Sequence, residues 1–356
     1  MAEKIANSKK KRTGTNAFWN WTRCLAKIAV VIFVLLVLTG VLYQAIASTR
    51  DMKRYPPPGR LVDVGGYRLH INSTGEGAPT VILDAGVCDY SLHWCLVQPE
   101  VAKFTRVCSY DRAGLGWSDA APPPRTSKKI VRELHTLLEK AEIPGPYVLV
   151  GHSFGGYNVR LFAHKYPEEV AGLVLVDAAH ENQWPRLPWS VRRLYEQWTR
   201  YMKSRRFWSP LGVNRLFNRT GVDPKLPENL QATDRALRLR TRYMSTLHNE
   251  WSEINGESAV QLRAATTLPQ VLMMVLTAEK HGDEPPPGVS EEDFVKWNAL
   301  LYEVQAELAS RCKDSVHIKV ANSTHTIPLD QPAAVIESIR KVVMAAREQR
   351  PLRTQE

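Results

Sequence analysis

Ser153 stands in the pattern Gly-His-Ser-Phe-Gly (151–155), a setting in which a serine hydroxyl can act as a nucleophile. The apolar run 148–150 before it predicts a buried strand, and residues 157–166 have apolar side chains at helical spacing. A strand, a sharp turn and a helix in this order push the hydroxyl clear of a sheet. The pattern therefore predicts an activated serine, and a purely structural Gly-Ser turn is the alternative.

A serine nucleophile needs a general base, and His325 is placed to supply it. It lies in the loop between the last predicted strand, residues 315–320, and a closing helix with apolar residues on one side. A base there would remove the Ser153 proton as the oxygen attacks a carbonyl.

Three carboxylates are candidates for the acid that orients this base. Asp177 directly follows the apolar run 170–176 and is the preferred one, since chemistry in parallel sheets gathers at the carboxyl ends of the strands. Glu279 and Asp283 follow the next apolar run, 270–277, and remain open. The alternative for Asp177 is a helix cap or a loop brace.

Residues 111–118, Asp-Arg-Ala-Gly-Leu-Gly-Trp-Ser, resemble the D-R-x-G-x-G-x-S loop of the α/β-hydrolase superfamily. With the serine pattern and His325, the resemblance covers residues 60–348, and the order Ser, Asp, His matches that of the family. It implies an α/β-hydrolase fold: a mostly parallel eight-stranded sheet, helices on both faces and a helical lid insertion. Asp111 and Arg112 would then brace their loop.

The same resemblance implies where an oxyanion would be held. Backbone N–H groups of Val87, in the loop after a predicted strand, and of Phe154, directly after the nucleophile, are the expected donors. Gly86 would let the backbone approach closely, and with His152 and Trp184 it is expected to contact the substrate. No metal or organic cofactor is implied.

The predicted core has two parts, residues 60–180 and 270–348, with a tail at 349–356. Residues 181–269 between them are too long for a simple crossover and carry half of the tryptophans and many arginines. The resemblance implies that this insertion is a helical lid. Its basic side chains are either simply solvated or act together with the tryptophans to contact anionic lipid or an acyl substrate.

The amino-terminal residues predict a membrane anchor. Residues 1–27 form a basic arm, and residues 28–47 have no charge and are long enough, at about 1.5 Å per residue, to cross roughly 30 Å of hydrocarbon. A cleaved signal peptide is the alternative. Residues 48–59 read as a Pro-rich extended linker. The basic arm favours a single-pass protein with its catalytic domain on the extracytoplasmic side.

The charge and cysteine content of the chain exclude few classes of function. The net charge of +11 lies partly beside the membrane segment, and no nucleic-acid motif accompanies it, so a nucleic-acid partner is not expected. The five cysteines lack metal-site spacing. The oligomeric state stays open.

Together these features predict a serine hydrolase that cleaves small hydrophobic carboxylic esters through an acyl-enzyme. A C–C bond hydrolase, a thioesterase, a lipase or an acyltransferase would use the same residues. A small-ligand receptor or scaffold with little turnover is an alternative of a different class.

Overall fold

The computed structural model describes residues 2–219, 221–265, 267–282 and 284–352, with side chains from Phe18 onward. One sheet of eight strands organises these residues, in the order β1-β2-β4-β3-β5-β6-β7-β8. The strands are β1 (Arg60–Asp63), β2 (Arg68–Thr74), β3 (Thr80–Asp84), β4 (Val107–Tyr110), β5 (Tyr147–His152), β6 (Val170–Val176), β7 (Leu272–Ala278) and β8 (Ser315–Val320). Only the β1–β2 and β2–β4 pairs are antiparallel, which confirms the predicted mostly parallel sheet.

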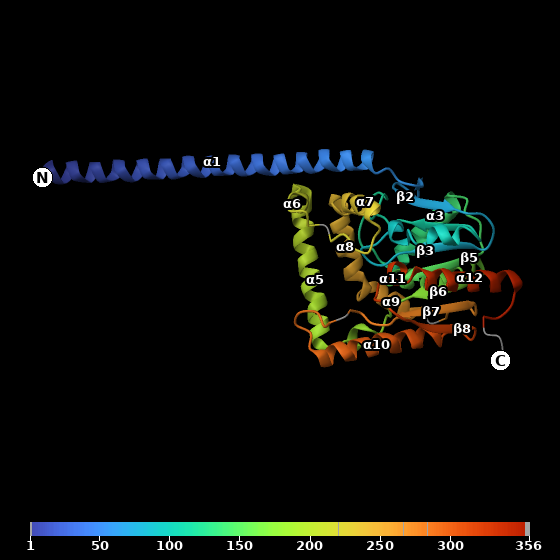
Figure 1. Ribbon diagram of the computed structural model, residues 1–356. Coiled ribbons are helices and arrows are strands. Elements are labelled where there is room, and N and C mark those ends of the chain that lie inside the picture. Colours follow the sequence, from blue (N-terminus) through green and yellow to red (C-terminus); the bar gives the residue numbers. More distant parts are fainter. Residues whose placement is uncertain (1, 220, 266, 283, 353–356) are drawn as a thin grey trace.

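Helices cover both faces of the sheet because its strands are apolar on both sides. In β5, Leu149 points into one buried cluster while Val148 and Val150 point into the other. The first cluster is covered by α3 (Ser127–Lys140), α4 (Gly155–Lys165) and α10 (Glu291–Ala309); the second is covered by η1 (Ser91–Trp94), α2 (Gln98–Val101), α11 (Ile327–Asp330) and α12 (Pro332–Glu348) (Figure 1). The sheet thus has the predicted helical layer on each face.

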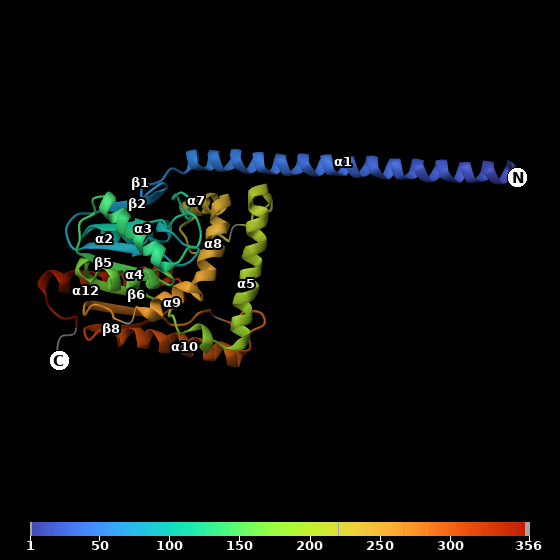
Figure 2. The same ribbon diagram turned by 180° about the vertical axis from the view of Figure 1, so that it is seen from behind.

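A helical insertion separates β6 from β7. It contains η3 (Trp184–Arg186), α5 (Trp189–Trp208), η4 (Ser209–Leu211), α6 (Val213–Leu216), α7 (Glu228–Arg238), α8 (Thr241–Ile254) and α9 (Glu257–Ala264). Ala259 and Leu262 of α9 belong to the same buried cluster as α4. The end of the predicted lid range therefore packs with the core, while α5 to α8 project beyond the sheet (Figure 2).

The amino-terminal segment is one helix, α1 (Ala2–Arg54), which is long and apolar enough to cross a membrane. The predicted span, residues 28–47, lies within it. The extended spacer predicted for residues 48–59 is shorter than expected, because the helix continues to Arg54 and leaves only residues 55–59 before β1. Contacts with the insertion support this extra helix, since Asp51 forms an ion pair with Arg215 at 2.7 Å.

Candidate active site

Ser153, Asp177 and His325 meet at the carboxyl edge of the sheet. Ser153 follows β5, Asp177 follows β6, and His325 lies in the loop after β8. The Oγ of Ser153 lies 3.0 Å from Nε2 of His325, and Nδ1 of His325 lies 2.6 Å from Oδ2 of Asp177. The structure therefore brings the three preferred residues of the sequence analysis into one chain of hydrogen bonds.

These contacts determine which ring nitrogen of His325 carries the proton. An ionised carboxylate only accepts hydrogen bonds, so Nδ1 of His325 donates to Asp177. Nε2 of the neutral ring is then an acceptor that faces the Ser153 hydroxyl. The other oxygen of Asp177, Oδ1, accepts the backbone N–H of Ala278 at 3.1 Å. This arrangement can remove a proton from Ser153 as its oxygen attacks a carbonyl.

A second imidazole contacts the same carboxylate, since Nε2 of His281 lies 3.0 Å from Oδ2 of Asp177. Burial by itself would raise the pKa of Asp177, but the charges and hydrogen bonds of His281 and His325 lower it well below 3.8. Burial also disfavours a charge on His325, yet the hydrogen bond and the negative charge of Asp177 raise the pKa of His325 above 6.5. Asp177 is thus ionised at neutral pH and stabilises a protonated His325.

The sharp turn around Ser153 explains the neighbouring glycine. Ser153 has φ +51° and Asp177 has φ +43°, in the left-handed region that non-glycine residues seldom occupy. The N–H of Ser153 donates to the carbonyl of Val176 at 3.1 Å, which holds the turn against β6. A Cβ at Gly155 would lie 2.3 Å from the carbonyl oxygen of Asp84. The turn therefore tolerates no side chain at position 155.

The two residues predicted to donate to an oxyanion flank the serine. Val87 lies in the wall of the cavity in front of Ser153, and Phe154 stands directly before the first turn of α4. A Cβ at Gly86 would come within 3.2 Å of the Ser153 Cβ, which is tighter than ordinary van der Waals contact. Gly86 thus permits the close approach of this loop, as expected.

Arg112 holds that loop in position. Its guanidinium donates to the carbonyls of Ala85 at 2.6 Å and Gly86 at 2.7 Å, and it pairs with Asp84 at 2.7 Å and with Glu250 of α8 at 2.8 Å. Arg112, Asp84 and Glu250 are all buried. Arg112 therefore braces the loop after β3, a different loop from 111–118, in which the family resemblance placed its role, and also connects this loop to the insertion.

His152 lines the cavity and also holds the loop of His325 in place. Its Nε2 lies 2.8 Å from the carbonyl oxygen of His325, which can only accept, so this nitrogen carries the proton. Burial, followed by the charge of His325, lowers the pKa of His152 to about 4. His152 is therefore neutral at physiological pH and fixes the backbone of the loop that carries His325.

The cavity in front of Ser153 has a volume of about 350 Å³, at the lower end of the range for small-molecule sites. Its apolar wall consists of Ala178, Ala179, Tyr195, Trp251, Ile254, Trp297 and Leu301. The rings of Tyr195 and Trp251 stack with centroids 5.2 Å apart. Two aspartates, Asp89 and Asp177, also line it, whereas no lysine or arginine does so within the described part of the chain.

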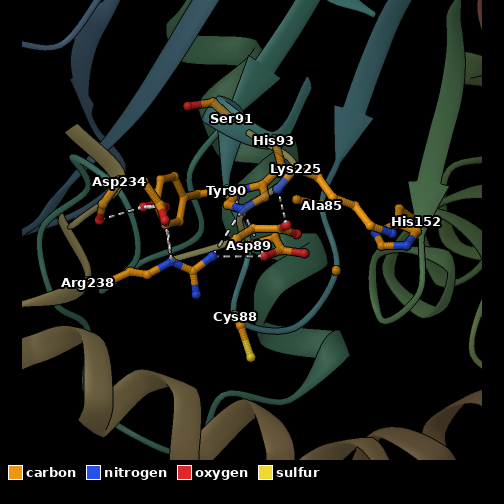
Figure 3. A network of polar contacts seen from close by, with 12 residues as sticks. Ala85, Cys88, Asp89, Tyr90, Ser91, His93, His152, Lys225, Asp234 and Arg238 are labelled. Atoms are coloured by element: carbon orange, nitrogen blue, oxygen red, sulfur yellow. Dashed lines mark hydrogen bonds and ion pairs between the residues drawn. The ribbon is translucent and has the colours of Figure 1, made fainter. Parts of the chain in front are cut away.

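Asp89 belongs to a buried network that links the loop after β3 to the insertion (Figure 3). Its carboxylate lies 3.2 Å from Nε2 of His93 and 3.4 Å from Nη2 of Arg238. Arg238 also pairs with Asp234 at 2.8 Å, and Asp234 accepts the hydroxyl of Tyr90. Burial would raise the pKa of Asp89, but the charges of His93 and Arg238 lower it. The cavity wall thus carries an ionised carboxylate.

The remaining predicted residues lie elsewhere. Glu279 is exposed and accepts the backbone N–H of Asn322 at 2.7 Å, away from His325, and Asp283 lies outside the described residues. The prediction that Trp184 contacts the substrate is wrong, since Trp184 does not line the cavity. The turn η3 directs it into the apolar cluster between α5 and α10, behind Tyr195, with ring centroids 5.7 Å apart.

Sequence reasoning missed His281 and the aromatic residues Tyr195, Trp251 and Trp297. His281 follows β7, in the very loop where an acid was sought, so its position at the carboxyl edge was a usable signal. The three aromatic residues gave no such signal, because their spacing along the insertion (Tyr195 and Trp251) and along α10 (Trp297) does not say which aromatic side chains face the cavity.

The ligating atoms of Asp177, His281 and His325 lie within 4.8 Å of one another, a set that could hold a metal ion. However, His325 already uses both ring nitrogens, one toward Asp177 and one toward Ser153. A metal bound to this ring would break the proton relay. The donor set therefore fits a hydrogen-bonded triad better than a metal centre.

Comparisons with known proteins agree with this geometry. A family model described as alpha/beta hydrolase fold matches residues 79–275. A probable transporter, efuK, of Hormonema carpetanum is 26% identical over 309 residues, which are 83% of this chain and 44% of that protein. The chain thus spans less than half of that relative.

Two solved structures illustrate the similarity of fold. An esterase from Thermogutta terrifontis has a TM-score of 0.56 at 21% identity, covering 81% of this chain and 98% of the esterase. The epoxide hydrolase CorEH has a TM-score of 0.60 at 18% identity, covering 80% of this chain and 97% of the epoxide hydrolase. Because the family model spans more than half of the 356 residues, the chain belongs to the alpha/beta hydrolase fold family.

Proposed function

We propose that the protein is a serine hydrolase that cleaves carboxylic esters through an acyl-enzyme. The observation that carries this proposal is the hydrogen-bonded series Ser153–His325–Asp177 beside a mostly apolar cavity. His325 takes the Ser153 proton while Oγ attacks the carbonyl carbon, and the N–H groups of Val87 and Phe154 stabilise the oxyanion. His325 then protonates the departing alcohol. In the second half, His325 deprotonates a water that attacks the acyl carbon. The bond from that carbon to Ser153 Oγ breaks, His325 returns the proton to Oγ, and the acid leaves.

The size and chemistry of the cavity support a small, neutral substrate. At about 30 Å³ per water-sized group, 350 Å³ holds roughly a dozen non-hydrogen atoms. The wall is mostly apolar and aromatic, and its ionised carboxylates, Asp89 and Asp177, oppose an anionic substrate. Short to medium acyl esters without a negative charge fit these conditions, and the insertion, as a lid, would exclude bulk water.

We also propose that α1 crosses a membrane and that the catalytic domain lies on the extracytoplasmic side. Supporting this, the side chains of the apolar run are exposed, for example Leu35 at 57% and Leu36 at 67%. The basic arm at residues 1–27 favours an amino terminus on the cytoplasmic side. A membrane-impermeant maleimide tests the topology at the exposed Cys24, which should react only from the cytoplasmic side.

Labelling with a fluorophosphonate probe tests the catalytic assignment. The full-length protein in detergent should react, and Ser153→Ala should abolish the reaction. Ser73→Ala, at an exposed serine of β2, is the matched control and should label normally. An unlabelled native protein would contradict the hydrolase and favour a ligand-binding role.

A series of p-nitrophenyl esters with acyl chains from C2 to C16 tests the substrate class. We expect kcat/KM to be highest between about C4 and C8, because longer chains exceed the volume of the cavity. A maximum at C16 would contradict a small acyl pocket. Equal turnover of a matched thioester would favour the thioesterase alternative.

A further inference from the structure

Helix α5 lies across one side of the catalytic domain and runs crosswise to α1 (Figures 1 and 2). Both views place α5 at the edge of the domain that faces the amino-terminal part of α1 (Figures 1 and 2). If α1 stands upright in a bilayer, α5 must run along the surface of that bilayer. The side of α5 turned away from the domain would then face the lipid.

That side of α5, continued by α6, carries large apolar residues in contact with solvent. Trp189 is 65% exposed and Phe207 is 68% exposed. They are eighteen positions apart, which is about five turns, so both lie on the same side of the helix. Leu216 and Phe217 at the end of α6 are 70% and 61% exposed. We call Trp189 and Phe207, with the exposed Leu216 and Phe217 at the end of α6, the outer aromatic face.

Cations accompany the aromatic residues. Arg193, Arg200, Lys203 and Arg206 are exposed on α5, and Glu196 is its one exposed acid. The inner side of the same helix is apolar and buried, with Val191 and Met202 against the domain. Aromatic and cationic side chains together on one side of a helix are typical of segments that lie in the headgroup region of anionic membranes.

The contact between α1 and the insertion sets the depth of this face. A Cβ at Gly40 would lie 2.6 Å from the carbonyl oxygen of Leu211, so α1 touches η4 directly at that level. The apolar run continues to Ala47, seven residues or about 10 Å further along the helix. Interfacial helices bury their apolar side by about 5–10 Å. Placing the run in hydrocarbon therefore brings α5 to the depth expected of an interfacial helix.

Polar contacts make this placement rigid. Gln44 lies within the apolar run, is only 3% exposed and donates to the carbonyl of Leu239 at 2.7 Å. Arg215 of α6 bonds the Gln44 side chain at 3.3 Å and pairs with Asp51 at 2.7 Å. The insertion is thus fastened to α1 over about two turns, and α5 cannot swing away from the membrane without breaking these bonds.

We propose that the outer aromatic face lies at the boundary between headgroups and acyl chains of the bilayer around α1, with Arg193, Arg200 and Lys203 reaching anionic phospholipid headgroups. The inference rests on the proposal that α1 crosses the membrane. It goes further, because it makes α5 a lipid-contacting wall of the catalytic domain.

Fluorescent labels in nanodiscs test the placement. The full-length protein with Cys24→Ser, which removes the exposed thiol, receives one new cysteine at Phe207 and carries an environment-sensitive dye there. Phosphatidylcholine nanodiscs with 30% phosphatidylserine contain a headgroup-level nitroxide lipid as quencher. A dye at Leu35→Cys is the control for a position inside the membrane. A dye at Glu168→Cys, exposed before β6 at the opposite edge of the sheet, is the control for a position in water. The Cys24→Ser chain alone gives the background.

We expect the dye at 207 to be quenched at least threefold more than the dye at 168. Lipid quenching at 35 with none at 207 would overturn the proposal while leaving the span intact, whereas no lipid quenching at 35 would contradict the span itself. A blue-shifted dye at 207 that lipid nitroxides do not quench would indicate contact with a second copy instead. Combining Arg193→Gln, Arg200→Gln and Lys203→Gln should reduce the quenching at 207, and an unchanged value would contradict the role of the anionic headgroups.

Discussion

The change Asp177→Asn tests the proposed proton relay most directly, because the two oxygens of Asp177 have separate tasks. Oδ1 accepts the N–H of Ala278, and Oδ2 accepts from His325 and contacts His281. Asparagine offers one acceptor and one donor in the same space. If its oxygen stays with Ala278, its NH2 group faces Nδ1 of His325, and that ring must adopt the tautomer protonated on Nε2.

Protonation on Nε2 removes the acceptor that Ser153 requires. In a Ser-His-Asp triad this wrong tautomer costs about 10⁴-fold in kcat, or about 5.5 kcal/mol at 1.36 kcal/mol per tenfold. We therefore expect hydrolysis of p-nitrophenyl butyrate by Asp177→Asn to fall by about four orders of magnitude, with KM little changed. The variant keeps the shape of the side chain, so circular dichroism should match that of the native protein.

Glu279→Gln is the matched control. Glu279 is exposed and bonds Asn322, so its loss should change kcat less than about threefold. A folded Asp177→Asn variant that retains more than a tenth of the native kcat would refute the relay. A large loss in Glu279→Gln instead would move the acid to the loop after β7.

Four further predictions follow from the site and its surroundings. Since neutral His325 is the base and Asp177 raises its pKa, the acid limb of the kcat/KM profile should have its midpoint above pH 6.5, with activity lost as the pH falls through it; a midpoint below 6 would contradict this. Gly155→Ala should lower the free energy of unfolding, measured by urea denaturation, by at least about 2 kcal/mol, because the new Cβ would lie 2.3 Å from the carbonyl oxygen of Asp84. Gly145→Ala, with no atom closer than 3.5 Å, should leave it nearly unchanged. Arg112→Ala should cost about 3–5 kcal/mol by the same measurement, because it leaves Asp84 and Glu250 buried and unpaired, while Lys103→Ala, in an exposed pair, should cost little. Mono-p-nitrophenyl glutarate should have a kcat/KM at least about tenfold lower than p-nitrophenyl valerate, because Asp89 opposes a second carboxylate in the cavity, and equal values would contradict that role.

The sheet could be predicted closely from the sequence because its central strands are continuous apolar runs. The runs 148–150 and 170–176 are buried on both sides, and the residues that follow such strands collect at one edge. Ser153 and His325 were identifiable on this basis. Between Asp177 and Glu279 the sequence left a choice, since each follows a strand, and only the side-chain directions separate them.

The insertion could not be predicted in the same detail. Its helices take their positions from partners distant in sequence, such as Glu250 on Arg112, and no local pattern encodes these pairs. For the same reason, Trp184 could not be told apart from Trp251 as a wall residue. The continuation of α1 to Arg54 likewise depends on the contact of Asp51 with Arg215, 164 positions further along the chain.

The bonds of Gln44 and Asp51 to the insertion make α1 a structural part of the α/β-hydrolase domain, in addition to its proposed role as an anchor. A shortened protein that starts at residue 52, the obvious choice for soluble expression, would lose both side chains and leave Arg215 and the Leu239 carbonyl without these partners. Such a protein would differ from the intact one in the rigidity of α6 to α8, and so in the wall of its own substrate pocket. Kinetic constants for the proposed ester hydrolysis are therefore best measured on the intact chain in a lipid environment.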